Sequence, residues 1–526
     1  MRRYLLLAVV CLTACSVAGC DRGSSGAAST STAVEAPQAT VTTSTTMAAV
    51  EGATTVTVSS DGLVWTACGD AECARLSVPL VHADPSAGTI ELAVARRTAT
   101  DPGNRIGVLL YNPGGPGIGG TDFIVDDYGF SGTFSSTLSK RFDVVSWDPR
   151  GTSEGTIVAC VDDPERLYAL DPTPESPQEM ALTEDSVREY ATGCAARSRE
   201  LVPYLSSVAT ARDMDLLREA LGEDQITYVG QSYGGQLGSI YATLFPQQTR
   251  AMVLDSALDT TAPWSATWMQ VAAMQEQLFN TMMDQCAGYR FCPFHNDGDP
   301  LAAFDDLMAR FDEQPLIVNG TEVGLGHAVL AVWTGLQDEE LLWPELLRAL
   351  ADAQDGDGTR VLALAEPLGE LRERFWSVTC LDWPTTAWEP AQADIDAVLA
   401  ASPRLGPYQT ATASRIGPYF EGLNPCRFWS VPPELPPAVT GSGAGPILVI
   451  GTTGDVLPFE SSRALADRLE QGTLLVVERT RHTAYQPGYV KTRCVTDTVD
   501  TYLTDLALPP DNSVCQHGKQ QLQPPN

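Results

Sequence analysis

Two serines of the chain stand in the pattern Gly-x-Ser-x-Gly, one at Ser153 and the other at Ser232. Such a serine can act as a nucleophile where a strand ends in a sharp turn and a helix follows. The glycines leave room for the turn, and the helix N-terminus stabilises a developing oxyanion. Residues 226–229 before Ser232 are a short apolar run, and residues 236–245 after it have a helical pattern. Ser153 follows an Asp-Pro-Arg-Gly turn and lacks this setting, so we predict Ser232 as the nucleophile, with a structural glycine-rich turn as the alternative.

A loop rich in glycine and proline at residues 112–117 follows another short apolar run, residues 107–111. In hydrolases with this kind of serine, one oxyanion donor is a backbone N–H of such a loop. The second donor is the N–H of the residue after the serine. We therefore predict Gly115 and Tyr233 as the two donors. A plain turn is the alternative for the loop.

The serine needs a general base, and the chain has five histidines. His482 follows the apolar run at residues 474–477, and we predict it as the base. Asp455 follows the run at residues 447–450, and we predict that its carboxylate orients the imidazole, in the chain order serine, aspartate, histidine. The alternatives are His82, His295, His327 and His517 for the base, and Glu460 and Asp467 for the carboxylate.

The short apolar runs alternate with helical patterns such as residues 211–221, which predicts an open, mostly parallel sheet buried on both faces. Residues 74–82 and 89–97 are expected to form a first antiparallel pair. After residue 255 the pattern becomes helical. It is clearest at residues 270–284, 300–311 and 339–353. We predict an α/β fold of the α/β-hydrolase kind, with a helical cap inserted between two parts of the sheet.

The first twenty residues predict an export signal, because Arg2 and Arg3 precede an apolar run at residues 4–18 that is short for a membrane span. The residues before Cys20 resemble the bacterial lipobox, so we predict Cys20 as the lipidated N-terminus of an extracellular, membrane-attached protein. Cys15 ends a similar match. A plain cleaved signal peptide and secretion are the alternative.

The predicted organisation has five parts. Residues 21–55 are poor in large apolar side chains and are expected to form a disordered tether, because they cannot bury enough surface to fold. The parts are a signal peptide at 1–20, the tether at 21–55, a first part of the hydrolase core at 56–255, a helical cap at 256–437, and a second part of the core with a disulfide-rich C-terminal region at 438–526.

Ten of the thirteen cysteines lie beyond the signal. In an exported protein this predicts about five disulfides, and we expect nearest neighbours to pair, since Cys68/Cys73 and Cys286/Cys292 would close short loops. A zinc site at Cys292 and His295 is the alternative, but no second ligand pair lies nearby. We predict neither a metal nor another cofactor.

The net charge of −33 argues against nucleic acid as a partner, because phosphate backbones would repel the chain. Contact with a membrane is expected through the lipid anchor alone. The sequence does not predict an oligomeric state.

Several of these motifs together resemble the secreted tripeptidyl aminopeptidases of high-GC bacteria, in the proline-iminopeptidase branch of the α/β hydrolases. The motifs are Asn-Pro-Gly-Gly-Pro-Gly at 112–117, Asp-Pro-Arg-Gly at 148–151, Gly-Gln-Ser-Tyr-Gly-Gly at 230–235, and Gly454-Asp455 with a late histidine. The resemblance covers about residues 65–515. It implies a peptidase that releases short peptides, above all tripeptides, from peptides or proteins with a free N-terminus. It also carries over Ser232, Asp455 and His482 as the triad.

Two segments depart from the pattern of that family. Arg481 stands where glycine usually precedes the histidine, and Thr152, Ser153 and Glu154 stand where glycine and serine usually follow the turn. We interpret both as differences in substrate preference. An enzyme that acts on N-termini also needs an anion for the substrate ammonium group. Asp382 is a candidate, with a solvated or capping aspartate as the alternative.

Two other functions use the same features of the sequence. A cell-envelope carboxylesterase or lipase would have the same triad. A binding lipoprotein whose hydrolase site has decayed would need no triad at all, so the intact Ser, Asp and His argue against it.

Overall fold

The structure is a computed structural model, which describes residues 62–153, 156–259, 262–417, 423–488 and 492–516. The predicted signal peptide, Cys20, the tether and His517 lie outside the described residues. The described residues all belong to one compact unit. None of the helices in the described part of the chain combines the length and the apolar character that a membrane crossing requires.

Within the described residues, ten strands form one sheet, and its edge-to-edge order is β1-β2-β3-β5-β4-β6-β7-β10-β11-β12. Along this order, the neighbours from β1 through β2 and β3 to β5 pair antiparallel, and the neighbours from β5 through β4 to β12 pair parallel. The strands are β1 (Thr66–Cys68), β2 (Ala71–Pro79), β3 (Thr89–Arg97), β4 (Gly107–Asn112), β5 (Phe142–Trp147), β6 (Ile226–Gln231), β7 (Thr249–Asp255), β10 (Ile447–Thr452), β11 (Gly472–Glu478) and β12 (Ser513–Gln516). The mostly parallel sheet and its antiparallel first pair are confirmed.

The central strands explain why the apolar runs could be found in the sequence. Every residue of β4, β6 and β10 is buried, because helices cover both faces of the sheet. The edge strands β1 and β12 were missed. They have three and four residues, too few for a pattern to emerge.

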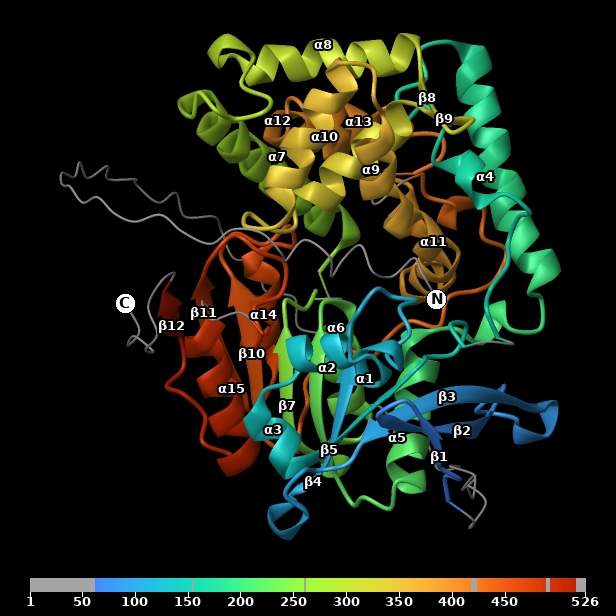
Figure 1. The fold of residues 1–526 in the computed structure, drawn as a ribbon. Coiled ribbons are helices and arrows are strands. Elements are labelled where there is room, and N and C mark those ends of the chain that lie inside the picture. The colour runs from blue at the N-terminus through green and yellow to red at the C-terminus, as the bar shows by residue number, and fades with distance from the viewer. Residues whose placement is uncertain (1–61, 154–155, 260–261, 418–422, 489–491, 517–526) are drawn as a thin grey trace, which may run out of the picture. The chain divides into compact units, whose positions relative to one another are not determined.

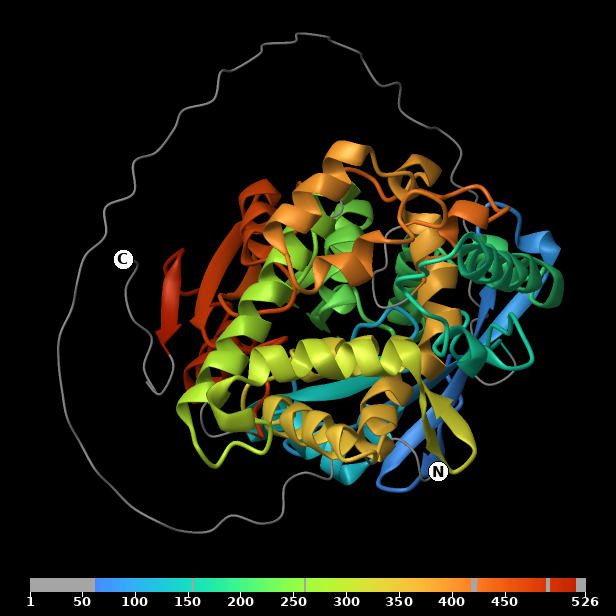
Figure 2. The same ribbon diagram turned by 90° about the horizontal axis from the view of Figure 1, so that it is seen from above.

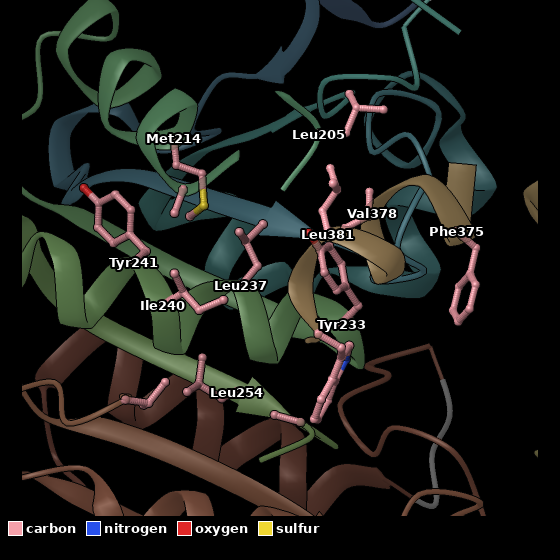
Figure 3. Close-up of a cluster of buried hydrophobic side chains, with 14 of the residues drawn as sticks. Leu205, Met214, Tyr233, Leu237, Ile240, Tyr241, Leu254, Phe375, Val378 and Leu381 are labelled. Carbon is pink, nitrogen blue, oxygen red and sulfur yellow. The ribbon is translucent and has the colours of Figure 1, made fainter. Parts of the chain in front are cut away.

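Helices cover the two faces of the sheet in separate layers. One apolar cluster joins α5 (Ser207–Ala220), α6 (Tyr233–Leu244) and α14 (Phe459–Arg468) to one face, and another joins α3 (Ser136–Arg141) and α15 (Arg493–Asp505) to the other. The short helices α1 (Asp122–Val125) and α2 (Asp127–Thr133) pack beside the second layer. Figure 3 shows Leu237 and Ile240 of α6 lying between Met214 of α5 and Leu254 of β7. This packing fixes α6, the helix that begins directly after Ser232.

The chain between β7 and β10 is mainly helical. Its helices lie above the sheet in Figure 1 and in front of it in Figure 2, which gives the view from above. They are α7 (Trp264–Gly288), α8 (Pro300–Glu313), α9 (Leu325–Gly335), α10 (Leu342–Gln354), α11 (Thr359–Asp382), α12 (Gln392–Ala401) and α13 (Gly406–Thr410). We call this region the cap. It also contains a hairpin of β8 (Leu316–Val318) and β9 (Thr321–Val323), which the sequence analysis did not anticipate.

One helix lies with the cap although the sequence analysis assigned it to the core. Tyr168 and Val187, the latter on α4 (Pro177–Arg197), belong to an apolar cluster with Leu330, Ala365 and Ile416 of the cap region. The predicted boundary of 56–255 for the first core part therefore includes a segment that packs against the cap. The sequence could not reveal this, because α4 has a weakly amphipathic pattern and gives no sign of which surface it covers.

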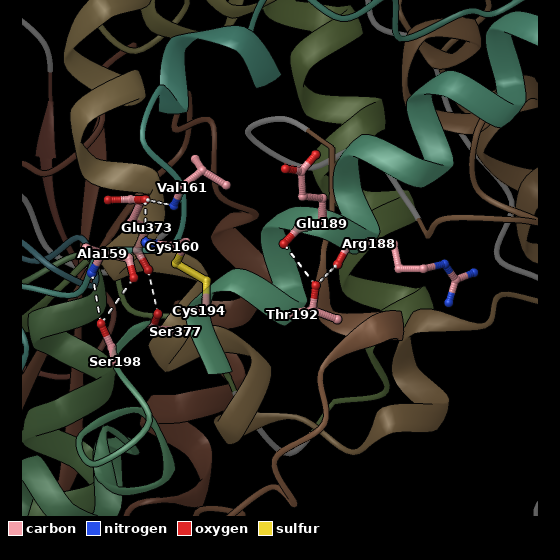
Figure 4. The surroundings of a disulfide bond; sticks show 10 residues. All are labelled: Ala159, Cys160, Val161, Arg188, Glu189, Thr192, Cys194, Ser198, Glu373 and Ser377. Carbon is pink, nitrogen blue, oxygen red and sulfur yellow. Dashed lines mark hydrogen bonds between the residues drawn. A yellow bond between two sulfur atoms is a disulfide. The ribbon is translucent and has the colours of Figure 1, made fainter. Parts of the chain in front are cut away.

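Five disulfides lie within the described residues, and each joins nearest neighbours in the sequence, as predicted. They are Cys68–Cys73, Cys160–Cys194, Cys286–Cys292, Cys380–Cys426 and Cys494–Cys515. The pairing of Cys292 with Cys286 removes its thiol from any zinc site. Figure 4 shows how Cys160–Cys194 fastens the chain before α4, where Glu373 of α11 accepts hydrogen bonds from the N–H groups of Cys160 and Val161.

Candidate active site

Ser232 occupies a strained turn between β6 and α6. Its φ and ψ are 56° and −123°, a conformation that a residue with a side chain rarely adopts. The turn is held by the N–H of Ser232, which donates to Asp255 O over 2.8 Å. A Cβ on Gly230 would lie 2.2 Å from Gly234 O, so glycine is required where the chain folds back. The hydroxyl is thereby presented at the carboxyl end of β6, partly exposed.

Asp455 and His482 meet at the ends of neighbouring parallel strands, β10 and β11. His482 Nδ1 lies 2.7 Å from Asp455 Oδ1, which also accepts a hydrogen bond from the N–H of Leu457 over 3.0 Å. Asp455 is 2% exposed. A carboxylate held in this way fixes the tautomer and orientation of the imidazole and stabilises its protonated form.

The alternative residues lie elsewhere. His82 contacts the buried carboxylate of Asp213, and His327 is buried within the cap, where desolvation lowers its pKa to about 4. Glu460 and Asp467 are exposed on α14. Of the described histidines, His482 is the one that lines the cavity with Ser232.

A cavity lies between the sheet and the cap, and both Ser232 and His482 line it. Gly115 and Tyr233, the two predicted oxyanion donors, line it as well. The glycine-rich loop is shaped from within by buried Asn112, whose Oδ1 accepts the N–H of Gly114 over 3.0 Å. The structure thus brings the predicted nucleophile, the predicted base and both predicted donors to the lining of one cavity.

Asp382, the candidate for binding an ammonium group, lies at the end of α11 and lines the same cavity. It is 5% exposed, and its carboxylate accepts hydrogen bonds from the N–H and the hydroxyl of Ser207 over 2.8 and 2.5 Å. Burial raises the pKa of Asp382 to about 7. The Tyr233 hydroxyl lies 2.7 Å from Ser207 Oγ, so a hydrogen-bonded chain joins this carboxyl to the residue after the nucleophile.

Two family models match the chain. One, for the α/β hydrolase fold, matches residues 107–297, and one described as TAP-like protein matches residues 415–515. The serine protease Hip1 of Mycobacterium tuberculosis is 30% identical over 499 residues, covering 86% of this chain and 90% of that protein. The tripeptidyl aminopeptidase of Streptomyces lividans is 31% identical over 449 residues, covering 82% of this chain and 81% of that protein. The chain belongs to the TAP-like family of α/β hydrolases.

The relatives of this TAP-like protein support a serine hydrolase of the peptidase kind. Carboxylesterase B of Mycobacterium tuberculosis is also similar, 32% identical over 469 residues, covering 85% of this chain and 86% of that protein. That similarity is compatible with an esterase and does not favour one. The first family model includes Ser232, and the second includes Asp455 and His482.

Asp255 and Ser256 of the core hold the loop that carries His482, and neither is among the predicted site residues. The carboxylate of Asp255 accepts the N–H groups of Ala484 and Tyr485 over 2.8–3.0 Å, and Ser256 Oγ accepts that of Thr483 over 3.2 Å. Burial raises the pKa of Asp255. Its place at the end of β7, next to β6 and β10, was a signal that could have found it.

The aromatic wall of the cavity was missed as well. Trp264 and Trp383 line the cavity with Asp382, and their rings meet edge to face at 5.1 Å between centroids. Trp333 and Phe375 complete the wall. Single tryptophans scattered over a helical region give no pattern that would predict a shared cavity.

Proposed function

We propose that the protein is an exported serine peptidase that releases short peptides, with tripeptides as the expected length, from free N-termini. The single observation that carries this proposal is the cavity itself, whose lining includes the buried residue Asp382, the tryptophans Trp264 and Trp383, and Ser232 with His482. A site for a cation next to a nucleophile suits a substrate with an ammonium group near the bond that is cut. The printed name of the Streptomyces relative supports the tripeptide length.

The chemistry follows that of a serine acyl transfer. His482 accepts the proton of Ser232 as the hydroxyl attacks the substrate carbonyl, and Asp455 stabilises the resulting imidazolium. The N–H groups of Gly115 and Tyr233 donate to the oxyanion. The imidazolium then gives its proton to the leaving amine, and water hydrolyses the acyl-enzyme in the same manner.

The ammonium group of the substrate is assigned to Asp382 and the indole rings of Trp264 and Trp383. Indole faces attract cations, and the attraction grows where water is excluded. A carboxyl group with a raised pKa gains most from such a partner, because a neighbouring positive charge favours its ionised form. Neither a cofactor nor a metal enters this chemistry.

Export and anchoring belong to the proposal too. Five disulfides suit an oxidising compartment, and Cys20 is assigned as the lipidated residue. In a bacterial host, Cys20→Ser should release the protein from the membrane fraction and abolish labelling with a fatty-acid analogue, whereas Cys15→Ser should do neither. Equal labelling of the Cys20→Ser protein would contradict the assignment.

The activity is tested with chromogenic tripeptide amides that carry either a free or an acetylated N-terminus. We expect turnover of the free form alone, and labelling of Ser232 by a fluorophosphonate. Asp382→Asn should raise the KM of the free peptide and leave the labelling rate unchanged. Thr379→Val, in the same cavity wall, is the matched control and should change KM little.

Other outcomes would identify the alternatives. Hydrolysis of p-nitrophenyl esters without hydrolysis of any peptide amide would assign the protein as a carboxylesterase. Equal turnover of the free and acetylated peptides would remove the role of Asp382. A protein that is neither labelled nor active on either substrate would be a binding lipoprotein.

A further inference from the structure

The loop that carries His482 is joined to the cap by a short antiparallel bridge. Asp338, just beyond α9, and Arg481 are its partners. Two backbone hydrogen bonds flank them, from the His482 N–H to Gln337 O over 2.7 Å and from the Glu339 N–H to Thr480 O over 3.3 Å. Residues 337–340 of the cap therefore run opposite residues 479–482, and the histidine itself takes part in the pairing.

In this register two arginines of the loop face two acidic residues of the cap. Arg481 pairs with Asp338 at 3.2 Å, and two positions along, Arg479 pairs with Glu340 at 3.0 Å. Alternate residues of extended chains point to the same side, which is why both pairs form in one register. The side chains of Arg481 and Asp338 are 6% and 7% exposed. The first pair is therefore buried, and the second is partly buried, since Glu340 is 25% exposed. Both pairs join the cap to the core.

Buried ion pairs of this kind determine geometry more than they add stability. Desolvation offsets most of their attraction, so apolar side chains of similar volume would hold the two segments together about as well. A shift of the register by one residue, however, would bury both guanidinium groups away from their carboxylates, which is strongly unfavourable. The two pairs therefore select one alignment of the cap segment with the loop.

The residues of this loop that follow His482 are held by the core. Asp255 and Ser256 accept the N–H groups of residues 483–485, as described above. His482 thus stands where a segment held by the cap meets a segment held by the sheet. Its imidazole also lines the substrate cavity, as does the side chain of Gln337.

We propose that Arg481 and Arg479 are positioning residues. By pairing with Asp338 and Glu340 they set the register between the cap and the histidine loop, and so place the imidazole of His482 for proton transfer with Ser232. The inference rests on the proposed function, since it assumes that His482 is the general base. It also gives a physical role to Arg481, the residue that departs from the family pattern.

The test measures kcat and KM for a free tripeptide amide and a small p-nitrophenyl ester, with rates normalised to the sites that a fluorophosphonate labels. For Arg481→Gln we expect kcat to fall about 10- to 100-fold on both substrates, because a displacement of about 1 Å can cost this much, and KM to change little. Arg481→Lys should recover part of the rate. Arg404→Gln, which breaks the Arg404–Asp305 pair elsewhere in the cap, is the matched control and should keep kcat.

A second variant separates positioning from stability. Asp338 Oδ1 also accepts the N–H groups of Glu340 and Leu341 over 2.8 and 2.9 Å. The double substitution Arg481→Met with Asp338→Asn removes both charges and keeps an oxygen for these N–H groups, so the melting temperature should stay near that of the wild type while kcat remains low. If kcat per labelled site is unchanged in Arg481→Gln, or if KM for the peptide alone rises, the inference is overturned. A wild-type protein that takes no label and cleaves nothing would instead overturn the proposed function, and the inference with it.

Discussion

The two Gly-x-Ser-x-Gly segments have the same sequence pattern and opposite surroundings. Ser232 is partly exposed in a cavity, with a strained φ of 56°. Ser153 is 0% exposed, and its Oγ accepts the N–H of Ala93 over 3.0 Å, which ties the segment to β3. Ser232 lines a cavity, whereas the hydroxyl of Ser153 is a hydrogen-bond acceptor inside the core.

The difference shows that the pattern alone does not make a nucleophile. The apolar strand before Ser232 and the helix after it force the strained turn. Ser153 instead follows a polar turn in which the Thr152 hydroxyl donates a hydrogen bond to Pro149 O. A buried serine that satisfies a backbone N–H contributes to stability. A serine in a strained turn at a cavity is available for chemistry. Each of the following predictions tests one part of this contrast.

The largest effect is expected from removing the two hydroxyls in turn. Ser232→Ala should lower kcat about 10⁶-fold, as loss of a catalytic serine typically does, and change the free energy of unfolding by about 0.5 kcal/mol or less. Ser153→Ala should keep kcat per labelled site but lower the free energy of unfolding by about 1–3 kcal/mol, because a buried N–H loses its acceptor. Steady-state kinetics measure kcat, and urea unfolding measures the free energy of unfolding, for both variants. Loss of fluorophosphonate labelling in Ser153→Ala would contradict the assignment of Ser153 as a purely structural residue.

The next effect compares the aspartates that lie near the two serines. Asp455→Asn should lower kcat about 10⁴-fold, because the amide favours the wrong tautomer of His482. Asp148, near Ser153, is half-buried, and desolvation raises its pKa, but it accepts hydrogen bonds from Thr121 and reaches no histidine that lines the cavity. Asp148→Asn should therefore keep kcat within a few-fold. Comparable losses in both variants would show that the carboxylates act through stability.

Much of the candidate site could be predicted from the sequence, because Ser232, Asp455 and His482 each follow an apolar strand that is buried on both faces. The ends of parallel strands gather at one edge, so Ser232, Asp455 and His482 could be brought together from strand order alone. The disulfide pairs followed from proximity along the chain. These features depend on local pattern or on rules that hold for all parallel sheets.

What could not be predicted depends on contacts between distant segments of irregular chain. The pairing of Asp338 with Arg481 joins a turn of the cap to a loop of the core, and no periodicity marks either one. The departure at Arg481 was visible in the sequence, but its reason was not. The same holds for α4, whose partner surface lies in residues more than a hundred positions further along the chain.

A smaller loss of activity is expected where the oxyanion loop touches the turn at Ser232. Gly114 has a φ of +105°, and a Cβ there would lie 2.6 Å from Gln231 O and 3.0 Å from Ser232 Cβ. Gly114→Ala should displace the loop and lower kcat about 10²- to 10³-fold, the usual effect of losing one donor, with less change in KM. Gly288→Ala, where the Cβ would meet open space, is the control and should change neither constant. An unchanged kcat in Gly114→Ala would contradict a role of this loop in stabilising the oxyanion.

The smallest effect is expected in the pH dependence of KM, because Asp382 lines the same cavity as Ser232. Its pKa of about 7 means that below pH 7 the carboxyl group is neutral and loses its attraction for an ammonium group. The α-amino group of a substrate loses its charge above about pH 8. For the free tripeptide amide, 1/KM should therefore be greatest between about pH 7 and 8 and fall on either side.

Asp382→Asn should raise KM about tenfold at pH 7.5 and remove the rise of KM below pH 7, while the dependence of kcat on the imidazole of His482 remains. If KM of the variant follows the same pH profile as that of the wild type, the ammonium group binds elsewhere in the cavity.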